Sequence, residues 1–225
     1  MSKNKKRKLN KKRVFKVLFI LIVIFVFFYK LFNTNITNIY ISGNDYLKDQ
    51  EIIDISKLDK YPLSIKNTSG KIEKRLENKT LILSAKVKKN VLLNEVYIEV
   101  KENYPLFYYE KDGKTILYDE TKYNDKLSSP ILINYVKEEI LDEFIKHMKK
   151  LDREVLNRIS EIEYIKDGKR EKFLLYMNDG NYVYVNFKNF KNLNKYIEIV
   201  KSFDGQKGVL NLDSGNNFEV FNEKA

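Results

Sequence analysis

The sequence predicts an α+β protein in which a single N-terminal transmembrane helix precedes two folded regions. Three observations predict this class. A long apolar run follows a basic tail at the start of the chain. Short strand and helix patterns then come in the order β-α-α-β-β, and the last half of the chain is dominated by strand patterns with a few helical ones.

The apolar run covers residues 14–32, and its only charged residues, Lys16 and Lys30, lie near its ends. Nineteen helical residues span roughly 28 Å, close to the ~30 Å hydrocarbon core of a bilayer. Tyr29 suits the membrane interface, where tyrosine is enriched. No small-residue cleavage site follows the run, so we expect an uncleaved anchor rather than a signal peptide.

The net charge of +11 comes mainly from the basic tail. Nine of the 42 basic residues lie in residues 1–16, which contain no acidic residue, so the rest of the chain is almost neutral. The positive-inside rule then places residues 1–13 in the cytoplasm and the bulk of the chain outside, with membrane lipid around the helix. A nucleic-acid protein would need basic residues clustered on its folded part, so we expect no nucleic-acid partner.

The first folded region is expected at residues 35–104. Its expected elements are a strand at 39–42, helices at 48–56 and 69–79, and strands at 81–87 and 96–101. The first strand should stop at Gly43-Asn44, a pair suited to left-handed turns. The segment 88–90 marks the turn between the last two strands, and Pro105 ends the region because proline cannot extend a central strand.

The second folded region is expected at residues 105–221, as a mixed β-sheet with flanking helices. Its expected strands lie at 106–109, 115–118, 131–135, 159–165, 173–177, 182–187, 209–212 and 218–221, and its expected helices at 138–151 and 189–203. Asp112-Gly113 marks a hairpin, and Asp179-Gly180 fits a type I′ turn.

The residues that catalysis or metal binding needs are scarce. The chain has no cysteine and one histidine, His147, which lies in a predicted helix. No G-x-S-x-G elbow, phosphate-binding glycine loop or calcium loop is present. We therefore expect no catalytic residue, no metal ligand and no cofactor. The 16 tyrosines and 14 phenylalanines lie mostly at strand positions, where packing explains them.

Three sequence segments, in this order after the basic tail and apolar run, resemble one bacterial family. They are the opening Ile36-Thr-Asn-Ile-Tyr-Ile-Ser-Gly-Asn, the segment Val96-Tyr-Ile-Glu-Val-Lys-Glu-Asn-Tyr-Pro, and Gly208-Val-Leu-Asn-Leu-Asp. The family is the division protein family FtsQ, called DivIB in Gram-positive organisms. The resemblance implies a POTRA-like domain at 35–104 and an FtsQ-type β domain at 105–221. The chain departs from the family at Asn211, where an aspartate is frequent, and at Asp213, where an arginine is frequent.

The resemblance also implies a function: a non-enzymatic scaffold in the cytoplasmic membrane at the division septum that regulates septal peptidoglycan synthesis. In this family the C-terminal edge strand pairs with FtsB of the FtsB–FtsL complex, and the POTRA-like domain contacts other membrane division proteins. The implied partner-binding residues are Leu212, Ser214, Phe218, Val220 and Phe221. The residues alone leave open whether this strand is a docking edge or an ordinary terminal strand whose apolar residues face the core.

Two other functional classes fit the sequence less well. A POTRA-bearing envelope assembly or secretion factor would ordinarily carry repeated POTRA units or a β-barrel, and neither fits this length. A membrane-anchored extracytoplasmic enzyme would need an acid–base constellation, which the sequence does not offer.

Overall fold

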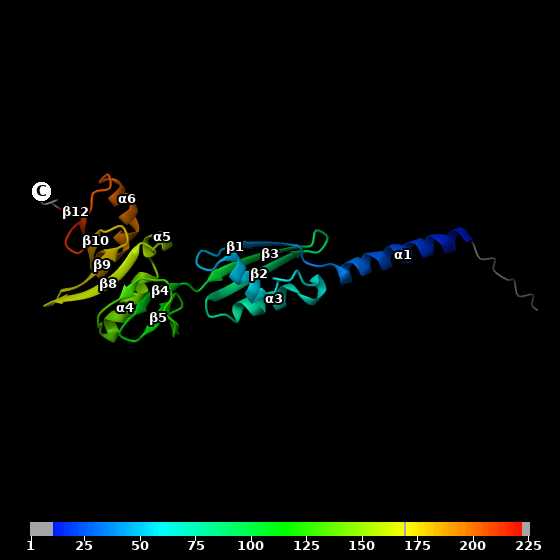
Figure 1. Cartoon of the computed structure of the whole chain (residues 1–225), viewed down its shortest axis with the longest axis horizontal. Helices are drawn as coiled ribbons and strands as arrows, with labels where there is room; N and C mark the ends of the chain where they lie inside the picture. The colour runs from blue at the N-terminus through cyan, green and yellow to red at the C-terminus, as the bar shows by residue number, and fades with distance from the viewer. Residues whose placement is uncertain (1–10, 169, 222–225) are drawn as a thin grey trace, which may run out of the picture. The chain divides into compact units, whose positions relative to one another are not determined.

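The computed structural model describes residues 11–168 and 170–221, apart from the side chains of residues 31, 32 and 167. Most of the basic tail predicted at 1–13 thus lies outside the described residues. The chain divides into two compact units, Met1–Glu102 and Asn103–Ala225 (Figure 1).

Unit 1 begins with helix α1 (Lys11–Asn33), which contains the residues predicted to be helical at 14–32. The helix ends where the Asn33 side-chain amide donates to the Tyr29 carbonyl at 3.2 Å and the Thr34 hydroxyl donates to the Lys30 carbonyl. Within the described part of the chain, no helix is both long enough and apolar enough to cross a membrane.

The rest of unit 1 is a three-stranded sheet with two helices and a short 3₁₀ turn. The elements are β1 (Asn38–Ser42), α2 (Asp49–Ser56), η1 (Ser64–Lys66), α3 (Ser69–Glu77), β2 (Ile82–Asn90) and β3 (Glu95–Glu102). The order in the sheet is β1-β3-β2, with β1 parallel and β2 antiparallel to the central β3. Val96, Ile98 and Val100 alternate with exposed residues along β3 and pack into one core with Ile52, Ile72 and Leu76 of the helices.

Gly43 has the left-handed φ of +80° that the sequence predicts. A Cβ at this position would lie 2.2 Å from the Val100 carbonyl oxygen, so only glycine lets β1 turn this close to β3.

The carboxylate of Glu102, the last residue of β3, holds the loop that follows β1. It is buried and accepts hydrogen bonds from the backbone N–H groups of Asp45, Tyr46 and Leu47, at 2.7 to 3.1 Å. Three successive N–H groups that converge on one carboxylate form a nest for negative charge. Glu102 thereby fixes the entrance to α2 against the end of the central strand.

The predicted turn at residues 88–90 is wrong by a few positions. These residues continue β2, and the turn to β3 lies at 91–94. The Asn90 side-chain oxygen accepts from the Leu93 N–H at 3.3 Å, and Asn94 adopts a left-handed φ of +61°. The Asn90 side chain and the left-handed backbone of Asn94 thus build a turn whose central residues, Leu92 and Leu93, are apolar. A search for polar turn residues does not find such a turn.

Unit 2 contains a nine-stranded mixed sheet in the order β12-β11-β10-β9-β8-β7-β4-β5-β6. Its strands are β4 (Pro105–Tyr109), β5 (Lys114–Leu117), β6 (Lys122–Tyr123), β7 (Ile131–Leu132), β8 (Ile159–Asp167), β9 (Arg170–Met177), β10 (Tyr182–Val185), β11 (Gly208–Asn211) and β12 (Asn217–Val220). The pairs β4–β7, β7–β8 and β10–β11 are parallel. Pro105 is the first residue of its strand, where a missing N–H is tolerated.

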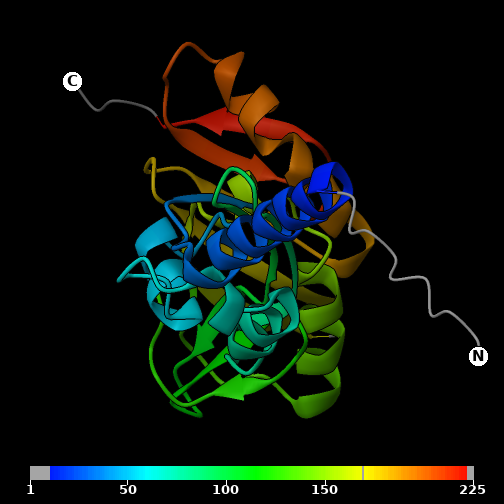
Figure 2. The same ribbon diagram turned by 90° about the vertical axis from the view of Figure 1, so that its right-hand side faces the viewer.

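The helical segments of unit 2 are α4 (Glu138–Met148), α5 (Arg153–Leu156), η2 (Phe187–Lys195) and α6 (Tyr196–Lys201). They pack on the sheet through an aromatic cluster in which Phe144 of α4 stacks on Phe173 of β9, with ring centroids 4.3 Å apart. Phe190 and Tyr196 join the same core. Figure 1 and Figure 2 both place α6 beside the β11–β12 hairpin, and Phe203, just after α6, packs on Phe218 of β12 at 4.3 Å.

Three expectations for unit 2 need correction. The strand expected at 131–135 is only the two residues of β7, because the Asn134 side chain, rather than a longer ladder, binds the backbone of Tyr164 in β8. The helix expected at 189–203 is a 3₁₀ segment followed by the short α6, since Asn186 and Asn194 use their side chains on nearby and distant backbone. The turn at Asp179-Gly180 is not type I′, because only Gly180 has a positive φ.

We predict that Glu102→Gln releases the loop at 45–47. The amide keeps one acceptor but loses the charge that strengthens the N–H bonds, so hydrogen exchange at these amides should rise by roughly tenfold or more, equivalent to about 1.5–3 kcal/mol. Hydrogen–deuterium exchange mass spectrometry measures this. Glu99→Gln, at an exposed position on the same strand, is the control. Equal protection in both variants would contradict the role assigned to Glu102.

Candidate partner-binding site

β12 lies at one end of the nine-stranded sheet and pairs only with β11 among the described strands. Next to the strand, the Phe221 N–H donates to the Lys207 carbonyl at 2.8 Å. In an antiparallel pair, hydrogen-bonded residues alternate with residues whose N–H and C=O groups face outward. By this register, Phe218 and Val220 present their backbone groups to the open edge.

The five residues expected to bind a partner lie in different environments. Ser214 is exposed in the β11–β12 turn, and its hydroxyl contacts the Asp213 carboxylate at 3.2 Å. Val220 and Phe221 are each 40% exposed. Phe218 is half-buried against Phe203.

Leu212 differs from the other four because it is completely buried in the core of unit 2. Its N–H donates to the Tyr184 carbonyl and its carbonyl accepts from the Asn189 side chain, both at 2.7 Å. In this fold Leu212 therefore holds β11 in place, and its side chain offers no surface to a partner.

Gly208 lets the two strands of the hairpin approach closely. A Cβ here would lie 2.2 Å from the Glu219 carbonyl oxygen and 2.9 Å from the Phe218 ring. Any larger residue would have to push β12 away from β11. The open edge thus depends on a glycine in the strand behind it.

The face of the sheet beside β12 carries aromatic residues that the sequence analysis did not assign to the site. Tyr182 of β10 is 37% exposed and forms edge-to-face pairs with Phe221, at 5.6 Å, and with Tyr176, at 5.4 Å. The alternation Tyr182-Val-Tyr-Val places Tyr182 and Tyr184 on this face while Val183 and Val185 enter the core. That alternation could have indicated the surface.

An ion pair closes this face at the turn. Lys172 of β9 contacts the Asp213 carboxylate at 3.1 Å and lies over the Tyr184 ring at 4.3 Å. Burial by itself would raise the pKa of Asp213, but the hydrogen bond and charge of Lys172 outweigh it and hold that pKa below its usual value. Asp213, one of the two residues at which the chain departs from the family pattern, is therefore a charged partner within this chain.

A buried polar network supports the hairpin from behind. The Tyr196 hydroxyl donates to the Asp179 carboxylate at 2.8 Å and accepts from the Asn181 side chain at 3.0 Å. The Asn181 oxygen accepts from the Gly208 N–H at 2.9 Å. Burial, together with the nearby Asp179, raises the pKa of Tyr196, so the hydroxyl stays protonated and keeps donating.

Among the described residues, no group of three or more His, Asp or Glu side chains could hold a metal ion. His147 stacks on Phe187 with ring centroids 5.1 Å apart. Burial and the charge of Lys150 lower the pKa of His147, although Glu143 opposes them. A half-buried histidine packed on aromatic rings is explained by packing alone.

Known proteins are similar to this chain both in its first folded region and over most of its length. A model of the FtsQ-type POTRA domain matches residues 34–103. The chain is 32% identical to cell division protein DivIB of Bacillus cereus over 81% of this chain and 75% of the relative. It is 30% identical to DivIB of Bacillus anthracis over 95% of this chain and 84% of the relative. The chain belongs to the FtsQ/DivIB family.

Membership in the FtsQ/DivIB family confirms the resemblance predicted from the sequence, and its members' names support a role in cell division. DivIB of Bacillus subtilis is 27% identical over the full chain and 90% of its own length. The solved major extracytoplasmic domain of DivIB from Geobacillus stearothermophilus is similar over 44% of this chain and 92% of that domain, with 23% identity and a TM-score of 0.36. That TM-score is too low to support a conclusion about the fold.

We predict that Gly208→Ala detaches β12 while the rest of unit 2 stays folded. The added methyl would overlap the Glu219 carbonyl, so β12 should lose exchange protection, at a cost of about 1–3 kcal/mol. Hydrogen exchange of residues 217–220 measures the effect. Gly215→Ala, in the same hairpin, is the control. A Cβ at Gly215 would lie 3.4 Å from the nearest atom, the Asn217 Oδ1, so this change should leave protection unchanged. Equal protection of β12 in both variants would show that the close approach is unimportant.

Proposed function

We propose that the chain is a non-enzymatic, single-pass membrane scaffold of the bacterial division machinery. It binds FtsB- and FtsL-like division proteins through the edge of β12 and so helps to regulate septal peptidoglycan synthesis. The observation that carries the proposal is the open edge itself, where Phe218 and Val220 direct backbone donors and acceptors outward. An added strand would satisfy these groups by β-augmentation.

The side chains around this edge suit a partner strand. Val220, Phe221 and Tyr182 are the large apolar residues of unit 2 that are exposed here. Aromatic residues at the centre of an interface contribute much of its binding energy. The exposed Ser214 lies at the far end of the hairpin and would contact the partner at the rim.

Unit 1 offers a separate surface for other membrane division proteins. Tyr40 of β1 and Tyr97 of β3 stack with ring centroids 4.9 Å apart on the side of the sheet opposite the helices, and both are more than 40% exposed. Lys86, Lys88 and Glu99 surround them on the same face. This aromatic and charged face suits a protein contact.

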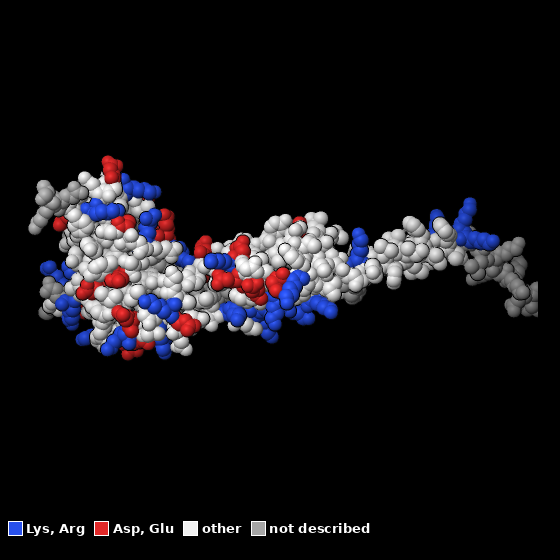
Figure 3. Space-filling model, in the orientation of Figure 1, with Lys and Arg blue, Asp and Glu red and all other residues white. Residues whose placement is uncertain are grey.

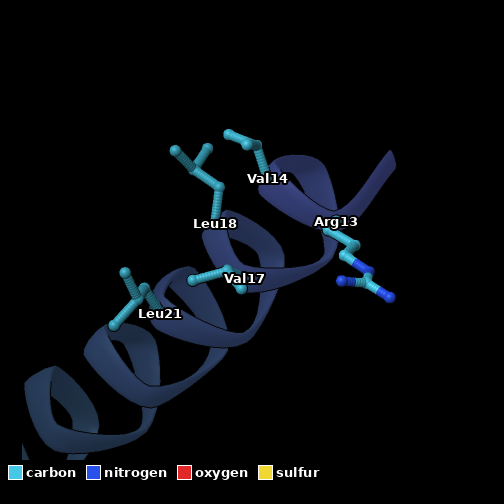
Figure 4. A pocket seen from close by; sticks show the side chains of 5 residues that line it. All are labelled: Arg13, Val14, Val17, Leu18 and Leu21. Atoms are coloured by element: carbon cyan, nitrogen blue, oxygen red, sulfur yellow. The ribbon is translucent and has the colours of Figure 1, made fainter. Parts of the chain in front are cut away.

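The anchor in the proposal is α1, with the N-terminus in the cytoplasm. Every apolar side chain described from Val14 to Tyr29 is at least 43% exposed, on all sides of the helix. Figure 3 draws α1 almost free of charge between its ends, and Figure 4 shows Val14, Val17, Leu18 and Leu21 projecting outward beyond Arg13. A helix that is apolar all round requires apolar surroundings. The sequence adds Leu31 and Phe32, which bring the run to the length of a bilayer core.

A fluorescent fusion of the full chain tests the cellular role. We expect it to concentrate at mid-cell in dividing cells, because a division scaffold must assemble where the septum forms. Even distribution around the envelope would contradict the proposal.

Val220→Pro tests the edge. Proline removes an N–H that faces outward, so pairing with β11 survives, whereas a partner strand loses a hydrogen bond and meets the ring. We expect capture of a purified FtsB-like partner to fall by about tenfold or more. Val220→Ala keeps the N–H and should reduce capture much less. Equal capture by both variants would rule out strand addition at β12.

A further inference from the structure

We propose that unit 1 contacts the membrane a second time, through a membrane-facing rim formed by Tyr61, Ile65, Leu92 and Leu93. These side chains would insert into the interfacial layer of the bilayer that α1 spans. The inference rests on the proposed membrane anchor and extends it, since it assigns a lipid-binding surface to the folded part of unit 1.

Exposure sets these four residues apart. Outside α1, six large apolar residues of the described part of unit 1 are exposed, and two of them, Tyr40 and Tyr97, stack on each other on the sheet face. The other four lie in two loops. Tyr61 and Ile65 belong to the loop between α2 and α3 that contains η1, and Leu92 and Leu93, 81% and 58% exposed, belong to the turn between β2 and β3. Two adjacent exposed leucines at the tip of a turn are costly in water and indicate a binding surface.

The leucines are held outward by an ordered turn. The Asn90 side chain accepts from the Leu93 N–H, and the left-handed Asn94 closes the turn. The Asn94 carbonyl in turn accepts from the N–H groups of Thr37 and Asn38, at 2.9 and 3.3 Å. The turn is therefore fixed to the segment that arrives from α1.

The second loop is fixed to the same segment. The Ile36 N–H donates to the Pro62 carbonyl at 3.0 Å, and the Ser64 N–H donates to the Thr34 carbonyl at 2.8 Å. Thr37 follows the last residue of α1, Asn33, by four residues, which span at most about 14 Å. Both loops consequently lie at the end of the folded part of unit 1 that is next to α1, within reach of the bilayer surface.

The charges of the rim fit lipid headgroups. Lys60 and Lys66 are exposed next to Tyr61 and Ile65, although Asp59 precedes them. Lysines beside apolar residues at an interface attract anionic headgroups while the apolar side chains enter the boundary with the acyl chains. The direct continuity with α1 favours lipid over a protein as the occupant.

The absence of cysteine makes a direct test possible, because each introduced cysteine carries the only label. Full-length Leu92→Cys, Leu93→Cys, Val23→Cys and Lys79→Cys variants would be labelled with an environment-sensitive dye in nanodiscs of phosphatidylcholine and phosphatidylglycerol. Val23 lies in the middle of α1. Lys79 is exposed and precedes the start of β2, at the end of that strand away from the leucine turn. Quenching by nitroxide lipids, with the nitroxide near the headgroup or deep in the acyl chain, reports the position of each label.

We expect the shallow nitroxide to quench the labels at 92 and 93 about threefold more than the label at 79, and the deep nitroxide to quench the label at 23 most. Quenching at 23 with labels at 92 and 93 no more quenched than at 79 would overturn the rim, keep the anchor and leave a protein as the occupant of the leucines. No quenching at 23 would overturn the anchor and, with it, the rim.

Discussion

An edge strand leaves every second N–H and C=O group without a partner in its own sheet. The two sheets of this protein differ in whether another part of the same unit binds these groups. In unit 1, the outward N–H groups of Ala85 and Val87 on β2 are taken by the carboxylates of Glu77 and Glu73 from α3, at 3.1 and 2.8 Å. This edge is closed by the unit itself. In unit 2, β12 has no such helix beside its outer edge among the described residues, so its backbone groups are available to another chain.

An open edge binds well only if it is already in the conformation that the partner needs, because ordering it at the moment of binding costs free energy. The features behind β12 have this effect. Gly208 permits the close approach of the two strands, and Asn181 connects β11 to the buried Tyr196. Leu212, fully buried, is important in this sense although it offers no contact surface. If a strand adds to β12 as proposed, the stability of the hairpin and the affinity for that strand are linked through residues buried behind the edge.

Periodicity predicted most elements of both units because apolar alternation reports directly which face of a strand is buried, as Val96, Ile98 and Val100 demonstrate. The failures share a different cause. At residues 88–94 and 186–195, asparagine side chains bind backbone groups and decide the local structure, and no periodic pattern records such bonds. The position of β12 at an edge was expected, but the exposure of Tyr182 depends on strand order, which links residues distant in the sequence. Glu102 lies in one of the segments that resemble the family, whereas the N–H groups that it binds come from a loop more than fifty residues earlier.

The central strand of unit 1 connects these features. Just before β3, the Asn94 carbonyl holds the segment that comes from α1, and at its last residue the Glu102 carboxylate holds the loop before α2. An eight-residue strand is about 26 Å long and is paired on both sides here, so its two ends cannot move independently. The strand that begins beside the segment from α1 therefore also leads the chain into unit 2. If the rim binds lipid, both α1 and the leucine turn constrain one end of β3, and unit 1 has a fixed orientation on the membrane instead of rotating about a single linker.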